Sequence, residues 1–128
     1  MFGNSPAKPC IFVGASRREL KALPAEVQRE IGHALYEAQC GREPAAAKAL
    51  KGFGSRGVLE VIEDFDGNTY RAVYTVRFAG VVYVLHAFQK KSKSGIATPK
   101  AEIEMIKVRL RAAEADYRTR FKAGEPRP

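Results

Sequence analysis

The sequence predicts a small α+β domain, in which an antiparallel β-sheet, mixed with one N-terminal strand, packs on two N-terminal helices and is followed by a C-terminal helix. Three observations predict this class. Two runs rich in β-branched and aromatic residues flank Ala79 and Gly80, as in a hairpin. Apolar residues recur at helical spacing after Pro24 and again after Pro99. The 128 residues, 45% of them hydrophobic, are enough for one modest core.

The N-terminal part is expected to begin with a flexible lead over residues 1–9. The run CIFVG at residues 10–14 predicts a short strand. The following SRRE has the form of a capping box, in which Ser16 would cap a helix and Glu19 would reach back from its third position. Pro24 limits this helix to about two turns, because proline interrupts a helix interior.

A second helix is predicted to begin at Pro24 and to end at Gly41. Its apolar residues share one face at helical spacing: Val27, Ile31, Leu35 and Ala38. Residues 41–57 then form a glycine-punctuated connection whose centre is compatible with a short helix.

Three antiparallel strands are predicted next, at residues 58–63, 70–78 and 81–89. Residues 64–68 join the first two and contain the Asp-Gly pair of a tight turn. Residues 79–80 join the last two as a two-residue loop. The alternative, a three-residue loop, would flip one strand relative to the other.

A C-terminal helix is predicted from Thr98, which would cap it, with Pro99 at its first position. Its apolar stripe consists of Ile103, Ile106, Leu110, Ala113, Tyr117 and Phe121. Its opposite, solvated face carries Lys107, Arg109, Arg111, Arg118 and Arg120. No domain boundary is visible, so we expect one domain over residues 10–122 and a flexible tail over residues 123–128.

The two-residue loop decides which hairpin side chains share a face of the sheet. It pairs Arg71 with Phe88, Val73 with His86, Thr75 with Val84 and Arg77 with Val82. The opposite face carries Tyr70, Ala72, Tyr74, Val76, Tyr83, Leu85 and Ala87. That second face is the more apolar, so we expect it to hold all the helices. The first face would then be open and would present Arg71, His86, Phe88 and Lys90.

These four side chains are the groups that an RNA-handling site uses. Arg71 could grip a phosphate with two N–H groups, Phe88 could stack on a base, and His86 could transfer a proton near neutral pH. Structural interpretations compete, because Arg71 could simply decorate a solvated face and His86 could be a hydrogen-bonded core residue.

The net charge of +8, from 22 Lys and Arg against 14 Asp and Glu, favours a polyanionic partner. Lys90, Lys91 and Lys93 follow the last strand and would form either a phosphate site or a solvated connector. Lys51 and Arg56 form a second basic group in a glycine-rich loop.

Several other classes of site have no signal in the sequence. It contains no P-loop, dinucleotide-binding or HExxH motif, and Cys10 and Cys40 lack the spacing of a zinc site. We therefore expect no cofactor, no metal and two reduced, partly buried thiols. The sequence also lacks a signal peptide and a run long enough to cross a membrane, so the expected location is the cytoplasm.

Three stretches resemble the RelE/ParE superfamily of toxins from type II toxin–antitoxin systems, in particular its HigB-like, phage-associated branch. They are LPAEVQREIGHAL, ALKGFGSRGVLEV and TYRAVYTVRFAGVVYVLHAFQKKSKSGIATPKAEIEMIKVRL. The combination of Tyr-Arg-x-x-Tyr with HAFQKK and with the Thr-Pro that opens the last helix carries the resemblance. It spans residues 12–113.

The resemblance implies an endoribonuclease, an mRNA interferase that cuts translated messenger RNA on the ribosome without a metal. By position, it implies that Arg71 holds the scissile phosphate. It also implies that Lys90 or Lys91 is the family's basic residue at the end of the last strand. His86 is added from the residues as the candidate for proton transfer, which completes the expected catalytic set. The expected RNA contacts are Lys51, Arg56, Arg77, Phe88 and Lys93.

The resemblance also implies a cognate antitoxin, HigA-like and with a helix-turn-helix, encoded next to the toxin. Two features depart from some relatives. Glu60 and Glu63 stand where those relatives carry lysines, and no tyrosine lies between Gln89 and Glu104. The alternatives are a ParE-like inhibitor of DNA gyrase with the same fold and a non-catalytic module that binds RNA or the ribosome.

Overall fold

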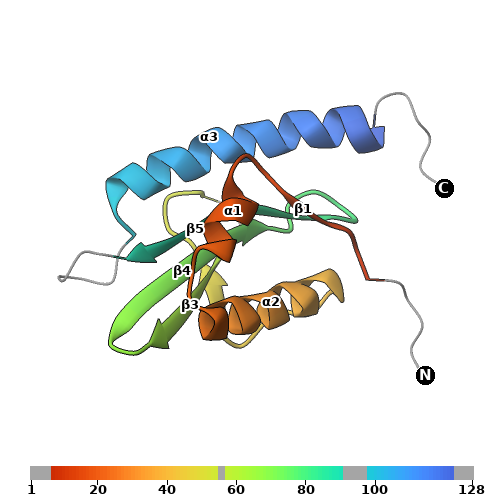
Figure 1. The fold of residues 1–128 in the computed structure, drawn as a ribbon. Coiled ribbons are helices and arrows are strands. Elements are labelled where there is room, and N and C mark those ends of the chain that lie inside the picture. The colour runs from red at the N-terminus through yellow and green to blue at the C-terminus, as the bar shows by residue number, and fades with distance from the viewer. Residues whose placement is uncertain (1–6, 55–56, 91–97, 123–128) are drawn as a thin grey trace, which may run out of the picture.

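The computed structural model describes residues 7–54, 57–90 and 98–122. It is a mixed α+β fold with a five-stranded sheet of order β1-β5-β4-β3-β2 (Figure 1). β1 runs parallel to β5, and every other neighbouring pair is antiparallel. The elements are β1 (Cys10–Phe12), α1 (Ser16–Lys21), α2 (Ala25–Gln39), β2 (Ala47–Ala49), β3 (Val58–Phe65), β4 (Asn68–Thr75), β5 (Val82–Lys90), α3 (Lys100–Tyr117) and η1 (Arg118–Lys122). The predicted fold class is confirmed.

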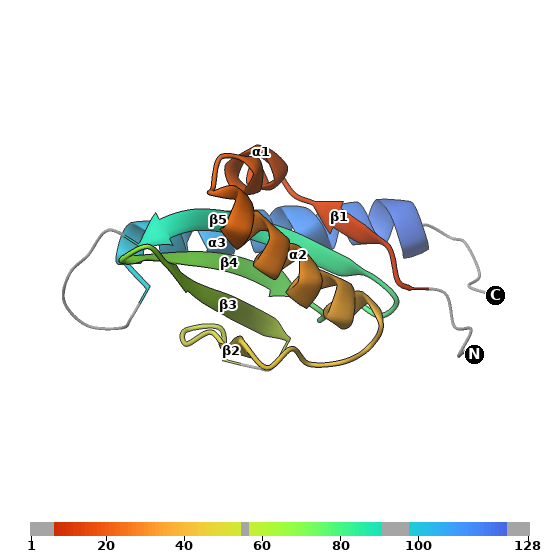
Figure 2. The same cartoon turned by 60° about the horizontal axis from the view of Figure 1, so that its bottom comes forward.

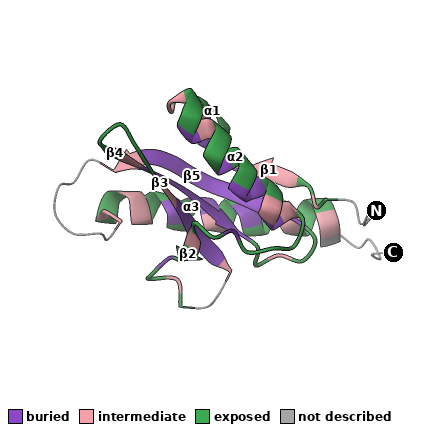
Figure 3. Ribbon diagram, turned by 90° about the horizontal axis from the view of Figure 1, so that it is seen from below, coloured by how far each residue is buried: buried purple, intermediate pink, exposed green. Residues whose placement is uncertain are grey.

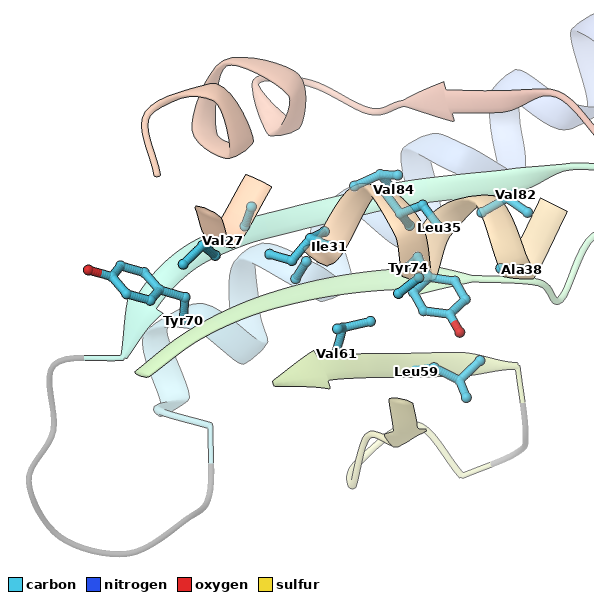
Figure 4. Close-up of a cluster of buried hydrophobic side chains, with 13 residues drawn as sticks. Val27, Ile31, Leu35, Ala38, Leu59, Val61, Tyr70, Tyr74, Val82 and Val84 are labelled. Carbon is cyan, nitrogen blue, oxygen red and sulfur yellow. The ribbon is translucent and has the colours of Figure 1, made fainter. Parts of the chain in front are cut away.

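The helix α2 covers one face of the sheet. The four residues of its predicted apolar face, Val27, Ile31, Leu35 and Ala38, are all buried. They pack on side chains of β3, β4 and β5, and Tyr74 lies among them (Figure 4). Pro24 is the N-cap of this helix rather than its first residue.

The helix α3 covers the opposite face, so the expectation that all helices lie on one face is wrong. Ile106 and Ala113 of α3 are fully buried in a second core with Val73, Tyr83 and Leu85 of the sheet. The remaining apolar residues predicted for this helix, Ile103, Leu110, Tyr117 and Phe121, pack against the same core. The central strands are therefore buried between two layers, and the outer faces of the helices are exposed (Figures 2 and 3).

The hairpin of β4 and β5 differs from the predicted one at its loop. β4 ends at Thr75 and β5 begins at Val82, so the connection is longer than two residues. Arg71 pairs with Phe88 and Val73 with His86, as predicted, but the expected pairs Thr75–Val84 and Arg77–Val82 do not form. Thr75 instead pairs with Tyr83, because the register shifts by one residue between Val73 and Tyr74.

This shift is a β-bulge at Leu85, and it rearranges the predicted faces. Tyr83 and Leu85 belong to the core under α3, whereas Val82 and Val84 belong to the core under α2. Both assignments are the reverse of the prediction. In a bulge two residues oppose one, so His86 follows Leu85 onto the α3 face and joins Arg71 and Phe88 there.

The predicted capping box at the start of α1 does not form. Ser16 is the first helical residue, Ala15 is the N-cap, and no side chain caps the helix. The buried Ser16 hydroxyl instead donates to the Val84 carbonyl at 3.0 Å and ties α1 to β5. Glu19 points away from the helix start, toward His86 and Arg109.

The connection after α2 contains a strand where the sequence was compatible with a short helix. β2 pairs with β3 through Ala47–Val61, Lys48–Glu60 and Ala49–Leu59. The predicted Asp-Gly turn is confirmed, since Phe65 pairs with Asn68 across Asp66 and Gly67, both with positive φ.

Both cysteines are free thiols. Cys10 is half-buried, and burial raises the pKa of its thiol to about 11, while Cys40 is exposed rather than partly buried as expected. In the part of the chain that the structure describes, no helix combines the length and the apolar character needed to span a bilayer.

Candidate functional site

A buried ion pair lies on the sheet face that α3 covers. Arg71 of β4 donates from Nη1 to Oε2 of Glu60 on β3 at 2.9 Å, and the two side chains are 4% and 3% exposed. Glu60 occupies an inward position between Val58 and Ile62, where a lone carboxylate would be strongly disfavoured. The guanidinium of Arg71 supplies the countercharge that this position needs.

Thr98, just before α3, completes the pair. Its hydroxyl donates to Glu60 Oε2 and lies 2.9 Å from Nη1 of Arg71. Thr98 was predicted to cap the helix, but Pro99 is the N-cap and no side chain caps α3. The hydroxyl is thus used to connect the start of α3 to the ion pair.

The ion pair borders an open pocket of about 260 Å³. The pocket is lined by Lys48, Ala49, Leu50, Lys51, Glu60, Thr98 and Ile103. Its walls are mostly apolar, with two lysines from the β2 region and one carboxylate. Both hydrogen bonds to the Glu60 side chain end on Oε2, and among the described residues none donates to Oε1. A ligand in this pocket would therefore meet a carboxylate oxygen beside two cations.

A second charged cluster lies under the same helix and is closed. His86 bonds through Nδ1 to Glu19 at 2.9 Å and through Nε2 to Glu102 at 2.5 Å. Arg109 donates to both carboxylate oxygens of Glu19, at 2.8 and 2.9 Å, and to the Leu85 carbonyl at 3.0 Å. The cluster thus joins α1, β5 and α3.

The cluster places two basic side chains against two carboxylates. Nδ1 of His86 lies 2.9 Å from Glu19 and 3.2 Å from Nη1 of Arg109, and Nε2 faces Glu102. Burial alone would raise the pKa of Glu19, but the hydrogen bonds from Arg109 and His86 and the Ala87 N–H outweigh it and lower that pKa below its ordinary value.

The structure brings Arg71, His86 and Phe88 onto one face, but they are not open as expected. Their exposed fractions are 3%, 6% and 8% because α3 lies over them. The Phe88 ring stacks on the His86 ring with 4.9 Å between centroids. Lys90 lies at the end of β5, half-buried, opposite Thr69. The Phe88 ring is therefore not exposed for stacking on a base in this conformation.

The other expected RNA contacts are placed differently. Lys51 lines the pocket beside Glu60. Arg77 is exposed beyond the end of β4, with Nη2 at 3.5 Å from the Phe53 carbonyl, and is six residues from Arg71, roughly 20 Å along an extended chain. Arg56, Lys91 and Lys93 lie outside the described residues.

Five residues of these clusters were not identified as site residues from the sequence: Glu19, Glu60, Thr98, Glu102 and Arg109. Arg109 was placed on the solvated face of the last helix, yet it is buried. Its spacing could have placed it correctly, since it lies three residues after Ile106 and four before Ala113, both on the buried stripe. Glu60 had a similar signal, an acidic residue at an inward position of an alternating strand. Thr98 had none beyond its capping propensity.

No group of three or more His, Cys, Asp or Glu residues that could hold a metal ion occurs within the described ranges. The chemistry that the pocket can offer from its described residues is a carboxylate acceptor, two lysine ammonium groups and a guanidinium behind the carboxylate. Such a set suits a ligand with an anionic group and a hydrogen-bond donor next to each other.

Two solved structures are similar to this chain. The chain is similar to a double arginine-to-alanine mutant of the E. coli toxin RelE in the free state, with a TM-score of 0.51, 18% identity, and coverage of 84% of this chain and 98% of that chain. The RelBE2 toxin–antitoxin complex of Mycobacterium tuberculosis has a TM-score of 0.47 and 16% identity over 66% of this chain and 99% of that one. No curated protein matches the chain.

At 18% identity the similarity to the RelE structure establishes the fold alone. The sequence itself matches a family description, "Phage derived protein Gp49-like", over residues 18–111. This match extends from α1 into α3 and includes all seven residues of the two charged clusters. The chain belongs to the phage-derived Gp49-like family.

Proposed function

We propose that this protein is the toxin of a type II toxin–antitoxin system and acts as an endoribonuclease on messenger RNA at the ribosome. The observation that carries the proposal is the Glu60–Arg71 pair at the edge of a pocket that also contains Lys48 and Lys51. The likeness of the fold to the toxin RelE and the basic net charge of +8 support it. Membership of the HigB-like branch and a cytoplasmic location are part of the same proposal.

The proposed reaction is an internal transfer at phosphorus. A ribose 2′-oxygen attacks the adjacent phosphorus and loses its proton to a base, while the bond from phosphorus to the 5′-oxygen breaks. The leaving 5′-oxygen takes a proton from an acid. The products are a 2′,3′-cyclic phosphate and a free 5′-hydroxyl, so the bond-breaking step consumes no water and needs no cofactor.

In this reaction cations stabilise the extra negative charge on the phosphoryl oxygens. We assign this role to Arg71 together with a lysine of the Lys90–Lys91 pair, and the approach of the RNA to Lys48 and Lys51. The substrate phosphate would compete with Glu60 for the guanidinium of Arg71. Binding therefore has to be coupled to a rearrangement of the Glu60–Arg71–Thr98 contacts or of α3 above them.

Two residues are candidates for proton transfer. Glu60 is favoured because it lines the pocket and no described residue donates to its Oε1. His86, the candidate from the sequence, remains the second. Both of its ring nitrogens bond to carboxylates, so it would first have to release Glu19 or Glu102. Removing Glu60 should therefore remove catalysis, and it should also lower stability because Arg71 stays buried without its carboxylate. Removing His86 should lower stability with a smaller effect on catalysis.

The proposal is tested by inducing the protein in a bacterium and mapping cleavage by primer extension on one translated and one untranslated message. The informative variant is Glu60→Leu/Arg71→Met, because removing both partners of a buried ion pair leaves no uncompensated charge and should preserve the fold. Arg29→Ala, which removes an exposed arginine from α2, is the control. Circular dichroism of the purified proteins checks that both variants are folded.

We expect growth arrest with cuts only in the translated message for the wild type and the control, and neither for the double variant. Arrest with intact messages would contradict the nuclease and would direct attention to DNA gyrase as the target. Binding to RNA or to ribosomes without cleavage or arrest would leave a non-catalytic binding module. The expected partner, a HigA-like antitoxin with a helix-turn-helix, is tested by whether co-expression of the protein encoded next to this one restores growth.

A further inference from the structure

The helix α1 carries three exposed basic side chains, which we call the α1 cations: Arg17, Arg18 and Lys21. They line one shallow hollow together with Gly14 and Ala15. Lys21 lies three residues after Arg18 and four after Arg17, so its Cβ atom is roughly 5–6 Å from each of theirs. The three charges therefore act together on whatever occupies the hollow.

The single carboxylate of α1 does not neutralise these cations. Glu19 points toward α3, where its two carboxylate oxygens accept from Arg109 at 2.8 and 2.9 Å. No ion pair joins the α1 cations to an acidic residue within the described ranges. A partner from outside the chain would therefore meet their full charge.

Three other exposed cations show a different arrangement. Arg29, Lys107 and Arg118 each have a carboxylate three or four residues earlier in the chain, at 3.1, 3.9 and 2.8 Å. Opposite charges at this spacing weaken each other's field at the surface, so these residues attract a polyanion less than their number suggests. The α1 cations lack this internal compensation.

The backbone that carries the α1 cations is held in place before a partner binds. The buried Ser16 hydroxyl donates to the Val84 carbonyl at 3.0 Å, and Glu19 is bonded to Arg109 and to His86. These contacts attach α1 to β5 and to α3. A preordered backbone lowers the entropy that binding costs.

The composition of the hollow determines the kind of partner. Its lining consists of three cations and two small residues, Gly14 and Ala15. It includes no aromatic ring on which an unpaired base could stack, and no large apolar side chain that could anchor a protein or insert into a membrane. The attraction that remains is to phosphate groups, which a double helix presents at regular intervals along both strands.

We propose that the α1 cations bind the phosphate backbone of a nucleic-acid double helix. Contacts of this kind position a partner without reading its sequence. The pocket beside Glu60 is a different site, because α1 packs beside β5 and the pocket lies at β2, with β4 and β3 between those strands (Figure 2). Strands β5 and β2 are three positions apart in the sheet, which corresponds to roughly 14 Å.

The inference does not depend on nuclease activity. If the proposed function holds, the double helix would belong to folded RNA of the ribosome, while the message would enter the pocket as a single strand. A DNA double helix offers the same phosphate chemistry, so the test includes both. None of its probes is translated, so its result stands whether or not the protein cleaves messages.

The test measures, by fluorescence anisotropy, the binding of the purified full chain to an RNA duplex, a DNA duplex of the same sequence and an unpaired RNA strand. The variant Arg17→Gln/Arg18→Gln/Lys21→Gln removes the charges with residues that favour a helix. We expect it to bind both duplexes at least about tenfold more weakly than the wild type does, and the unpaired strand within about threefold. On the DNA duplex, the slope of log affinity against log salt should fall by about 2.7, which is about 0.9 for each lost contact.

The matched control is Arg29→Gln/Lys107→Gln/Arg118→Gln, which lowers the net charge by the same amount and should keep duplex binding within about twofold of the wild type. The pocket variant Lys48→Ala/Lys51→Ala should show the reverse preference and weaken the unpaired strand more than the duplexes. Circular dichroism and thermal unfolding check that each variant is folded.

Equal losses of duplex binding in the α1 variant and the control would overturn the proposal, because net charge alone would then explain the binding. Equal losses for the duplexes and the unpaired strand would overturn it as well. Tighter binding of the RNA duplex would identify folded RNA as the source of the double helix, and tighter binding of the DNA duplex would identify DNA.

Vesicles with an anionic lipid and gel filtration test the other occupants. If the α1 variant loses vesicle binding while duplex binding is unchanged, the hollow belongs to a membrane surface and the double helix is rejected. The same holds for a second copy of the chain if the variant converts a wild-type dimer to a monomer and leaves duplex binding unchanged.

Discussion

Two charged clusters lie under α3. Both pair glutamate with arginine, but they differ in how completely their hydrogen-bonding groups are used. Near the start of α3, Glu60 and Arg71 form an ion pair that Thr98 joins by hydrogen bonds and that borders a pocket. Further along β5, Glu19, His86, Glu102 and Arg109 form a closed network. In the open cluster the carboxylate keeps an oxygen that no described residue bonds, whereas in the closed one both ring nitrogens and both oxygens of Glu19 are bonded.

The difference shows that burial of charge does not by itself mark an active site. A closed network of two carboxylates, a histidine and an arginine fixes α1, β5 and α3 to one another, and its loss should reduce stability. A cluster with spare bonding capacity beside a pocket can bind a substrate. The proposed reaction therefore belongs to the open cluster, and four experiments test this assignment.

The largest effect is expected from Glu60→Gln, compared with Glu102→Gln as the same change in the closed cluster. If Glu60 is the base, its variant should lose RNA cleavage by on the order of a thousandfold, because the amide cannot accept the proton. Glu102→Gln should keep cleavage within a few-fold of the wild type. Rates of cleavage on translating ribosomes measure both, and comparable losses in the two variants would remove the distinction between the clusters.

A large loss of stability is expected from Arg109→Met. The variant leaves Glu19 half-buried without its bidentate partner, which should lower the free energy of unfolding by roughly 3 kcal/mol. Arg111→Met, two residues along the same helix but exposed, should change it by less than about 0.5 kcal/mol. Urea denaturation gives both values. Similar stabilities for the two variants would mean that the closed network contributes little.

A smaller effect is expected from Lys48→Ala/Lys51→Ala at the pocket. Losing two phosphate contacts should weaken the binding of single-stranded RNA about tenfold and reduce the slope of log affinity against log salt by about 1.4. Unfolding should be unaffected, because both lysines are exposed. An unchanged salt slope would exclude these lysines from the RNA interface.

The smallest effect is a dependence of stability on pH. The pKa of Glu19 is lower in the folded chain than its ordinary value of 4.5, so the folded state gains stability from its ionised form above that value. This stability is lost as pH falls below 4.5 and the carboxylate takes up a proton. The free energy of unfolding, measured from neutral to acidic pH, should fall less steeply in Glu19→Gln than in the wild type. Parallel curves for the two proteins would contradict a stabilising role for the ionised Glu19 carboxylate.

The sequence predicts the elements of this fold better than their contacts. Helical periodicity placed α2 and α3, and runs of β-branched and aromatic residues bounded by turn residues placed the three long strands. These patterns did not place β2, whose residues Ala47–Ala49 have little strand propensity and form a strand only because β3 offers an unpaired edge. The sequence also did not predict that α3 covers the face that carries Arg71. The hairpin is rich in apolar residues on both faces, and the prediction treated one face as polar and open.

The candidate site was predicted in part. Arg71, His86 and Phe88 were grouped correctly, although a two-residue loop that does not exist was used to group them. The bulge at Leu85 offsets the longer loop and restores the predicted register at the Arg71 end. The partners of these residues, Glu60, Thr98 and Arg109, could not be paired with them from local pattern, because each contact joins segments distant in the chain.

The same bulge divides the hairpin into two parts whose pairing registers differ by one residue. The loop near Ala79 and Gly80 could gain or lose one residue. Forming or removing the bulge at Leu85 would then compensate for the change in register. Insertions and deletions at that loop would then leave Arg71 and His86 on their face. The distal loop is thus free to vary in length while the chemistry at the other end of the hairpin stays in place.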